Sequence, residues 1–120
     1  DYRILYLSGR WRKPRSEFML NATIYVSLSG LSDGMIAWDA LRVHGVLANY
    51  LATEWVNGFV RGRDVELDGY EVEQGLEKDS YRITLSGNDK AGIFSGISRT
   101  YFNNWCGRME GKYLFEDRES

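Results

Sequence analysis

The segment from Arg99 to Trp105 concentrates side chains that could hold a small ligand. Arg99 offers a guanidinium group for a carboxylate or phosphate, Asn103 an amide, and Tyr101 an aromatic ring with a hydroxyl group. A few such polar groups give an otherwise apolar cavity its selectivity, so the expected ligand is a small apolar or anionic molecule. With two further tryptophans, the predicted ligand-binding residues are Arg99, Tyr101, Asn103, Trp105, Trp38 and Trp55.

Residues for other kinds of chemistry are scarce. His44 is the only histidine and Cys106 the only cysteine, which excludes an intramolecular disulfide and a multi-cysteine zinc site. The chain has no Asp-x-Asp-x-Asp-Gly calcium loop and no cofactor motif. We therefore assign no catalytic residue and expect neither a metal nor a cofactor.

The charged residues gather in two segments of opposite sign. Residues 1–15 carry five basic groups and one acid, whereas residues 64–79 carry seven acids and one lysine. In the second segment, alternation of acids with Val65 and Leu67 is typical of a solvated strand face. The net charge of −2 argues against nucleic acid as a partner. The two segments could instead attract a charged protein partner or support self-association.

Alternation of apolar and polar residues defines the elements that must position these groups. From Phe18 to Leu28, every second residue is apolar, as in a strand with one buried face. Asp33-Gly34 is interpreted as a turn pair. Similar runs separated by turn formers cover residues 34–43, 54–61, 64–72, 80–86, 92–100 and 105–115. Strands at intervals of about ten residues predict an antiparallel meander.

The segment 46–55 fits two interpretations. Its apolar residues at 47, 51 and 55 have helical spacing, and its alanines and leucines favour a helix. It also alternates as a strand, with Val46, Ala48, Tyr50 and Ala52 on one side. We favour the strand, because every neighbouring element is one.

These elements predict an all-β fold, an antiparallel meander closed into an eight- or nine-stranded up-and-down barrel. Glycines within the strands, at positions 45, 58, 96, 107 and 111, would let the sheet curl and aromatic rings cross the backbone. Closure would also remove exposed sheet edges. The alternatives are a two-sheet sandwich and a barrel with a helix at 46–55.

The order Gly9-Arg10-Trp11 near the start, followed by this meander, resembles the calycin group of lipocalins, fatty-acid-binding proteins and avidin-like barrels. Those families often open with Gly-X-Trp on the first strand. The resemblance implies an up-and-down barrel in which the indole of Trp11 plugs one end. The cysteines of lipocalin disulfides are not found in this sequence.

Strand parity determines which residues would face a barrel interior. Arg99 shares the parity of Ile93 and Ile97, and it would enter the barrel if that row faces inward. The opposite row, Phe94, Gly96 and Ser98, could equally form the core. In the last strand, Trp105 shares a row with Met109, Tyr113 and Phe115, which we predict to be core.

We expect residues 1–120 to form a single domain, cut from a longer chain because it begins with Asp1 rather than Met. No apolar run approaches the roughly 20 residues of a membrane-spanning helix. The compartment stays open, with the cytoplasm favoured.

The first interpretation of function is a non-catalytic domain that binds a small ligand. The alternatives are a protein-interaction module with a filled barrel and an isomerase- or cyclase-like barrel enzyme.

Overall fold

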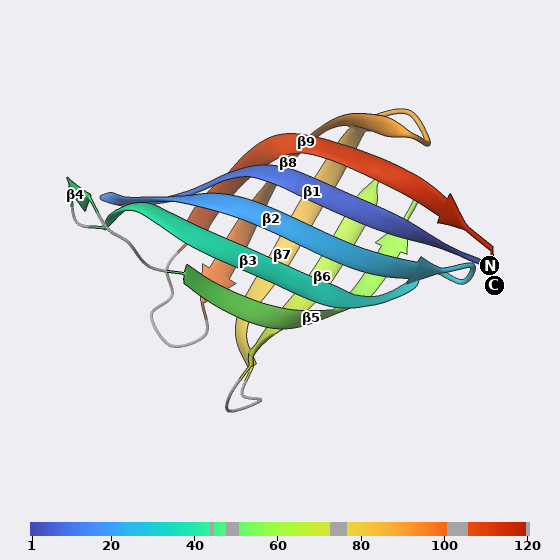
Figure 1. Cartoon of the computed structure of the whole chain (residues 1–120), viewed down its shortest axis with the longest axis horizontal. Helices are drawn as coiled ribbons and strands as arrows, with labels where there is room; N and C mark the ends of the chain where they lie inside the picture. The colour runs from blue at the N-terminus through green and yellow to red at the C-terminus, as the bar shows by residue number, and fades with distance from the viewer. Residues whose placement is uncertain (44, 48–50, 73–76, 101–105, 120) are drawn as a thin grey trace.

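The computed structural model describes residues 1–43, 45–47, 51–72, 77–100 and 106–119. Strands dominate these ranges, and no helix occurs within them. In chain order the strands are β1 (Tyr2–Lys13), β2 (Ser16–Ser27), β3 (Leu31–Val43), β4 (Val46–Leu47), β5 (Leu51–Arg61), β6 (Asp64–Glu71), β7 (Glu77–Gly87), β8 (Ala91–Thr100) and β9 (Cys106–Arg118) (Figure 1).

Eight of the strands form a closed antiparallel barrel. The ring runs β1-β2-β3-β5-β6-β7-β8-β9, and the pairing of β9 with β1 closes it. Strand β4 pairs only with the end of β3 and lies outside the ring. The predicted all-β meander and closed barrel are confirmed, and closure excludes the two-sheet sandwich. Within 46–55, the described residues are strand rather than helix, and residues 48–50 lie outside the described ranges.

The predicted strand over 18–28 is confirmed in β2, but it ends one residue early. Phe18, Leu20, Ala22, Ile24 and Val26 are buried, whereas Leu28 is 84% exposed. The chain turns at this point because the Gly30 N–H donates to the Ser27 carbonyl at 2.9 Å, with a positive φ of 92° at the glycine.

The interpretation of Asp33-Gly34 as a turn is wrong. Both residues lie inside β3, where Asp33 pairs with Tyr25 and Gly34 with Ile24 of β2. The turn that precedes β3 is instead the one at Gly30. Pairing with two neighbouring strands therefore overrides the local turn preference of the Asp-Gly pair.

Side chains of the inward rows fill most of the barrel. Leu5, Leu20, Ile36, Leu67 and Tyr81 belong to one continuous buried cluster, and each is completely inaccessible to solvent. In β9, Met109 and Tyr113 are buried, as predicted for that row. Trp105, assigned to the same row, lies outside the described residues.

The two ends of the barrel differ. The chain termini meet at one end, which we call the terminal end, and β4 lies at the other, which we call the β4 end (Figure 1). Trp11 is buried inside the β4 end, where its Nε1 donates to Ser98 Oγ at 2.5 Å. Gly107 makes room for this ring, since a Cβ there would lie 2.3 Å from Trp11 Nε1.

Candidate functional site

A small pocket lies inside the β4 end of the barrel. Its volume is about 120 Å³, and strands from around the ring contribute to its wall. We call it the polar pocket, and it is lined by Trp11, Lys13, Phe18, Trp38, Ala52, Thr53, Glu54, Lys78, Asp79 and Thr100. This volume is well below the roughly 300 Å³ of a pocket for a drug-sized ligand. It is close to the roughly 150 Å³ of an engineered cavity that takes up one benzene molecule.

Stacked aromatic rings form one side of the pocket. The ring of Trp11 lies 3.9 Å from that of Trp38 and 5.0 Å from that of Phe18, measured between centroids. Trp38 in turn stacks on Tyr81, with centroids 5.9 Å apart. Such stacks fix the orientation of each ring, so the polar groups on their edges point in defined directions.

Two buried carboxyl groups meet the hydroxyl group of Tyr81 beside this stack. Glu54 is 3% exposed and Asp79 is 2% exposed, although both are acids. The Tyr81 hydroxyl group donates to Glu54 Oε1 at 2.6 Å, and Asp79 Oδ2 lies 3.4 Å from it. Buried acids are rare unless they are paired or protonated, so this cluster is unlike an ordinary core.

The surroundings of Glu54 favour its protonated form. Burial, followed by hydrogen bonding and charge repulsion from Asp79, raises the pKa of Glu54 to about 8. The hydrogen bond from Tyr81 acts in the opposite direction. Burial also raises the pKa of Tyr81 well above its usual value, with the charges of both carboxyl groups adding to the effect. At neutral pH the cluster therefore holds a protonated Glu54 and an un-ionised Tyr81.

Lys13 brings a positive charge to the rim of the pocket. Its Nζ lies 3.9 Å from the centroid of the Trp11 ring, in a cation–π contact. Burial lowers the pKa of Lys13, while the charges of Asp79 and Glu54 oppose this effect. The half-buried Lys13 therefore adds a basic group to a rim that also contains Asp79.

Two polar atoms of the pocket lack a hydrogen-bond partner in the part of the chain that the structure describes. They are Trp38 Nε1 and Asp79 Oδ1, and both are buried. Leaving a buried donor or acceptor unsatisfied costs about 1–3 kcal/mol. One is a donor and the other an acceptor, and both belong to residues that line the same pocket. A molecule in the pocket could satisfy both.

The local sequence explains how Glu54 fits in the interior. Its inward row in β5 includes Val56 and Val60, so the strand directs the carboxyl group into the barrel. On the neighbouring strand, Gly69 leaves space for it: a Cβ at this position would lie 2.7 Å from Glu54 Oε2. The pairing of β6 with β7 is also irregular between Gly69 and Tyr70.

The structure separates the predicted ligand-binding residues. Trp38 lines the pocket, but Trp55 is 50% exposed on the outside of β5. Tyr101, Asn103 and Trp105 lie outside the described residues, as does His44. The strands on either side of residues 101–105 end at the pocket side of the barrel, where Thr100 lines the pocket.

Of the two rows that the sequence left open for this strand, the row with Arg99 faces outward. Arg99 is exposed, and so are Ile93 and Ile97 of the same row. The opposite row, with Phe94 and Ser98, faces inward. Ser98 is fixed inside by its hydrogen bond to Trp11, and that contact leaves Arg99 on the outer surface.

Glu54, Asp79 and Lys13 were not among the predicted site residues. Their signal in the sequence is a charged residue that interrupts an otherwise apolar row. Asp79 shares its row with Tyr81, Ile83 and Leu85, all of them buried, although it also belongs to the acidic segment 64–79. Parity, rather than local charge density, was the informative property.

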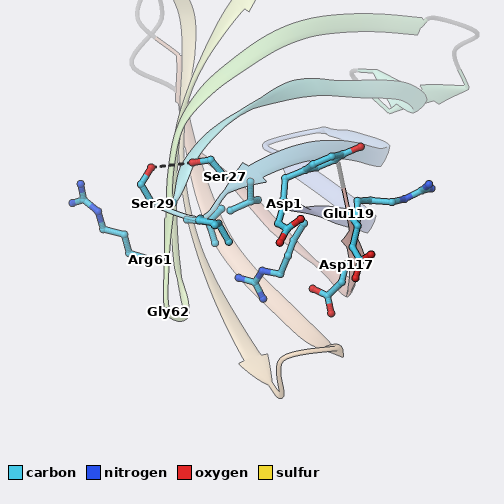
Figure 2. A pocket seen from close by; sticks show the side chains of 14 residues that line it. Asp1, Ser27, Ser29, Arg61, Gly62, Asp117 and Glu119 are labelled. Carbon is cyan, nitrogen blue, oxygen red and sulfur yellow. Dashed lines mark hydrogen bonds between the residues drawn. The ribbon is translucent and has the colours of Figure 1, made fainter.

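A larger groove of about 540 Å³ lies at the terminal end, between the chain termini and the β5–β6 turn (Figure 2). Arg61 extends away from Asp117 and Glu119 in this view, and Ser27 and Ser29 share a hydrogen bond of 3.0 Å. The charged side chains Asp1, Arg61 and Asp117 are exposed, so water solvates them. This groove does not bring buried polar groups together as the polar pocket does.

Comparisons of the chain with protein-family models, with curated proteins and with solved structures find no match. The geometry alone therefore defines the class: a closed eight-stranded antiparallel β-barrel with a polar pocket at one end. Among the described residues, no cluster of three or more His, Cys, Asp or Glu side chains could hold a metal ion. The same residues include no helix with the length and apolar character needed to cross a membrane.

Proposed function

We propose that the chain is a non-catalytic barrel that binds a small ligand at its β4 end, in the manner of calycin-type proteins. The observation that carries this proposal is the pair of buried, unpartnered atoms Trp38 Nε1 and Asp79 Oδ1. Pocket residues that present polar atoms of this kind discriminate strongly between ligands, because a poorly matched ligand leaves those atoms unsatisfied.

The pocket suggests the chemistry of the group that it takes. Trp38 Nε1–H requires an acceptor, and Asp79 Oδ1 requires a donor. A hydroxyl or amide group supplies both, whereas a carboxylate supplies only acceptors. The aromatic walls and the volume of about 120 Å³ suit a single ring or a chain of a few atoms. The expected ligand is therefore a small hydroxylated or amidated molecule, or a larger one that inserts such a group.

Phenol and benzene form a matched pair of probes for this pocket. Phenol has a hydroxyl group that both donates and accepts, whereas benzene offers only the ring. We expect phenol to quench the fluorescence of Trp11 and Trp38 in a saturable manner. We also expect benzene to bind at least about tenfold more weakly, the equivalent of one hydrogen bond of about 1.4 kcal/mol.

Variants connect this binding to the pocket. Asp79→Asn and Trp38→Phe should weaken phenol binding, because each alters one of the two unpartnered atoms. The matched controls on the outer surface, Asp64→Asn and Trp55→Phe, should leave it unchanged, since both residues are exposed. Equal binding of phenol and benzene, or equal binding by pocket and surface variants, would contradict the proposal.

A barrel-fold isomerase is the second candidate, and the raised pKa of Glu54 favours it. A carboxyl group with a pKa of about 8 exchanges protons near neutral pH, as a general acid or base must. The two candidates differ in the fate of the ligand. A molecule retained from the cells during purification would be released unchanged by a binder. An isomerase would convert it, and Glu54→Gln would abolish that conversion while preserving binding.

A further inference from the structure

One side of the barrel surface is acidic and apolar. We define the acidic face as the outward-facing residues of β3, β5 and β6. Trp55 is 50% exposed on this face, Leu31 is 58% exposed and Phe59 is 36% exposed. Five acids and two arginines give the face a net charge of −3: Asp33, Asp39, Arg42, Arg61, Asp64, Glu66 and Asp68.

The register of the strands places the apolar side chains of this face in two rows. Trp55 pairs with Met35 on one side and with Tyr70 on the other. Two rows away, Phe59 pairs with Leu31 and with Glu66. The row between them joins Asn57 to Asp33 and Asp68, so acidic side chains border the aromatic ones. Exposed Trp and Phe side chains placed in this way are typical of protein interfaces rather than of free surfaces.

The other side of the barrel is basic and apolar. We define the basic face as the outward-facing residues of β8, β9 and β1. Ile93 is 61% exposed on this face, Leu114 is 50% exposed and Ile97 is 49% exposed. Six bases and two acids give it a net charge of +4: Arg10, Arg12, Arg99, Arg108, Glu110, Lys112, Glu116 and Arg118.

Arg108 and Ile97 lie side by side at the centre of the basic face. They are register partners across β8 and β9, and both line a groove of about 550 Å³ with Arg82 and Glu110. Within the described part of the chain, Arg108 makes no ion pair, and neither does Asp33 on the acidic face. Both charges are therefore available to a partner.

The two faces lie on opposite sides of the ring. Strands β5 and β9 are four places apart in either direction around the eight-stranded barrel. Figure 1 shows β9 along the top of the molecule and β5 along the bottom. One molecule can therefore use both faces at the same time without the two partners touching each other.

We propose that the acidic face of one copy of this chain docks on the basic face of a second copy. The net charges of −3 and +4 attract one another, and both faces place exposed apolar side chains among their charges. A single kind of contact then covers both apolar surfaces, whereas foreign partners would require two different molecules of opposite charge. Complementary potentials of this kind set the orientation and speed of association.

The opposed positions of the faces determine the form of the assembly. A contact between two different surfaces is heterologous, and it closes into a ring only if each step turns the next copy suitably. Faces on opposite sides of the barrel place successive copies in a line. The assembly is therefore open-ended, and its average mass rises with protein concentration.

Sedimentation velocity on the full chain tests this proposal. The average mass of the wild type should rise with concentration at low salt. It should return to that of a monomer in about 1 M NaCl, where the Debye length is about 3 Å. Arg108→Glu reverses a charge on the basic face, and Asp33→Arg reverses one on the acidic face. Each variant should weaken self-association at least tenfold.

Mixing the two variants gives the decisive measurement. The Arg108→Glu chain keeps its acidic face and the Asp33→Arg chain keeps its basic face. Their mixture should form a dimer of one chain of each kind that does not grow further. Lys90→Glu and Asp89→Arg make the same charge changes in the exposed β7–β8 turn, outside the residues that define the two faces, and should associate as the wild type does.

Several outcomes would overturn the proposal. A wild type that remains monomeric at every concentration at low salt shows that the two faces do not bind each other. A mixture of the two variants that stays monomeric shows that the contact is not between opposite faces. Equal loss of association in the turn variants shows a general effect of charge. Binding of a different basic protein to the acidic face, without self-association, also rejects the second copy as the occupant.

Discussion

The hydroxyl group of Tyr81 lies 2.6 Å from Oε1 of Glu54 inside the barrel, although neither residue has a cationic partner in the hydrogen bond. This arrangement is stable because Glu54 is protonated, which avoids the cost of burying an ionised carboxylate. A neutral carboxyl group accepts from Tyr81 and can donate its own proton to Asp79, which avoids the repulsion between two like charges. The stability of the barrel and the chemistry of the polar pocket are thus linked through a single proton.

The first prediction is that the barrel loses stability as the pH rises. Folded Glu54 keeps its proton up to about pH 8, whereas the unfolded chain releases it near 4.5. Between these values the folded state binds more protons, so raising the pH favours unfolding. A tenfold change in proton affinity corresponds to about 1.4 kcal/mol, which makes the total effect roughly 5 kcal/mol. Urea unfolding at a series of pH values measures it.

Glu54→Gln serves as the matched variant for that experiment. Glutamine imitates the protonated acid, since its amide accepts from Tyr81 and donates to Asp79 without losing a proton. The fall in stability between about pH 5 and pH 8 should largely disappear, and the variant should exceed the wild type in stability at pH 8. An unchanged pH profile would show that Glu54 is ionised in the folded protein.

The second prediction concerns the close approach of Trp11 to the backbone of β9. A Cβ at position 107 would lie 2.3 Å from Trp11 Nε1 and 2.8 Å from Ser98 Oγ. Gly107→Ala should therefore displace a buried indole and its hydrogen bond, at a cost of about 2–4 kcal/mol in the free energy of unfolding. The control is Cys106, which precedes Gly107 and is exposed. Cys106→Ala should change the free energy of unfolding by less than about 0.5 kcal/mol.

The third prediction follows from the outward position of Arg99. Arg99→Ala should change the free energy of unfolding by less than about 0.5 kcal/mol and leave phenol binding unaffected, because the residue is exposed. Thermal unfolding and a fluorescence titration check both statements. A loss of phenol affinity in this variant would place Arg99 at the ligand site after all.

Two strands show how far the sequence alone could predict the structure. In β2 one row is apolar and the other largely polar, so alternation determined both the strand and its buried face. In β8 both rows mix apolar and polar residues, and long-range contacts decide which row faces inward. Phe94 and Ser98 face inward because Gly111 admits the Phe94 ring and Trp11 binds Ser98. Those partners come from β9 and β1, so the sequence of β8 could not settle the position of Arg99.

The polar pocket was hidden for a related reason. Glu54 and Asp79 become neighbours only when β5, β6 and β7 pair in their observed register, and Gly69 between them provides the space. Each acid occupies an inward row, which the sequence does show, but an isolated acid in a strand is normally a solvated one. The aromatic member of the cluster, Tyr81, was identifiable as core from its alternation with Arg82 and Thr84.

The fourth prediction is that Tyr81→Phe raises the pKa of Glu54 further. The Tyr81 hydrogen bond stabilises the ionised carboxylate and therefore lowers that pKa. Without the hydroxyl group, Glu54 should retain its proton to a pH above 8, and the fall in stability should extend to higher pH. The variant should also be less stable by about 1–3 kcal/mol at pH 5, because Glu54 loses a buried donor.

Unfolding curves between pH 5 and pH 10 separate the two effects of Tyr81→Phe. The change in pKa moves the stability profile along the pH axis, whereas the lost hydrogen bond lowers stability at every pH. A variant whose profile moves to lower pH would contradict the prediction, because it would show that the Tyr81 hydroxyl group favours the protonated form of Glu54.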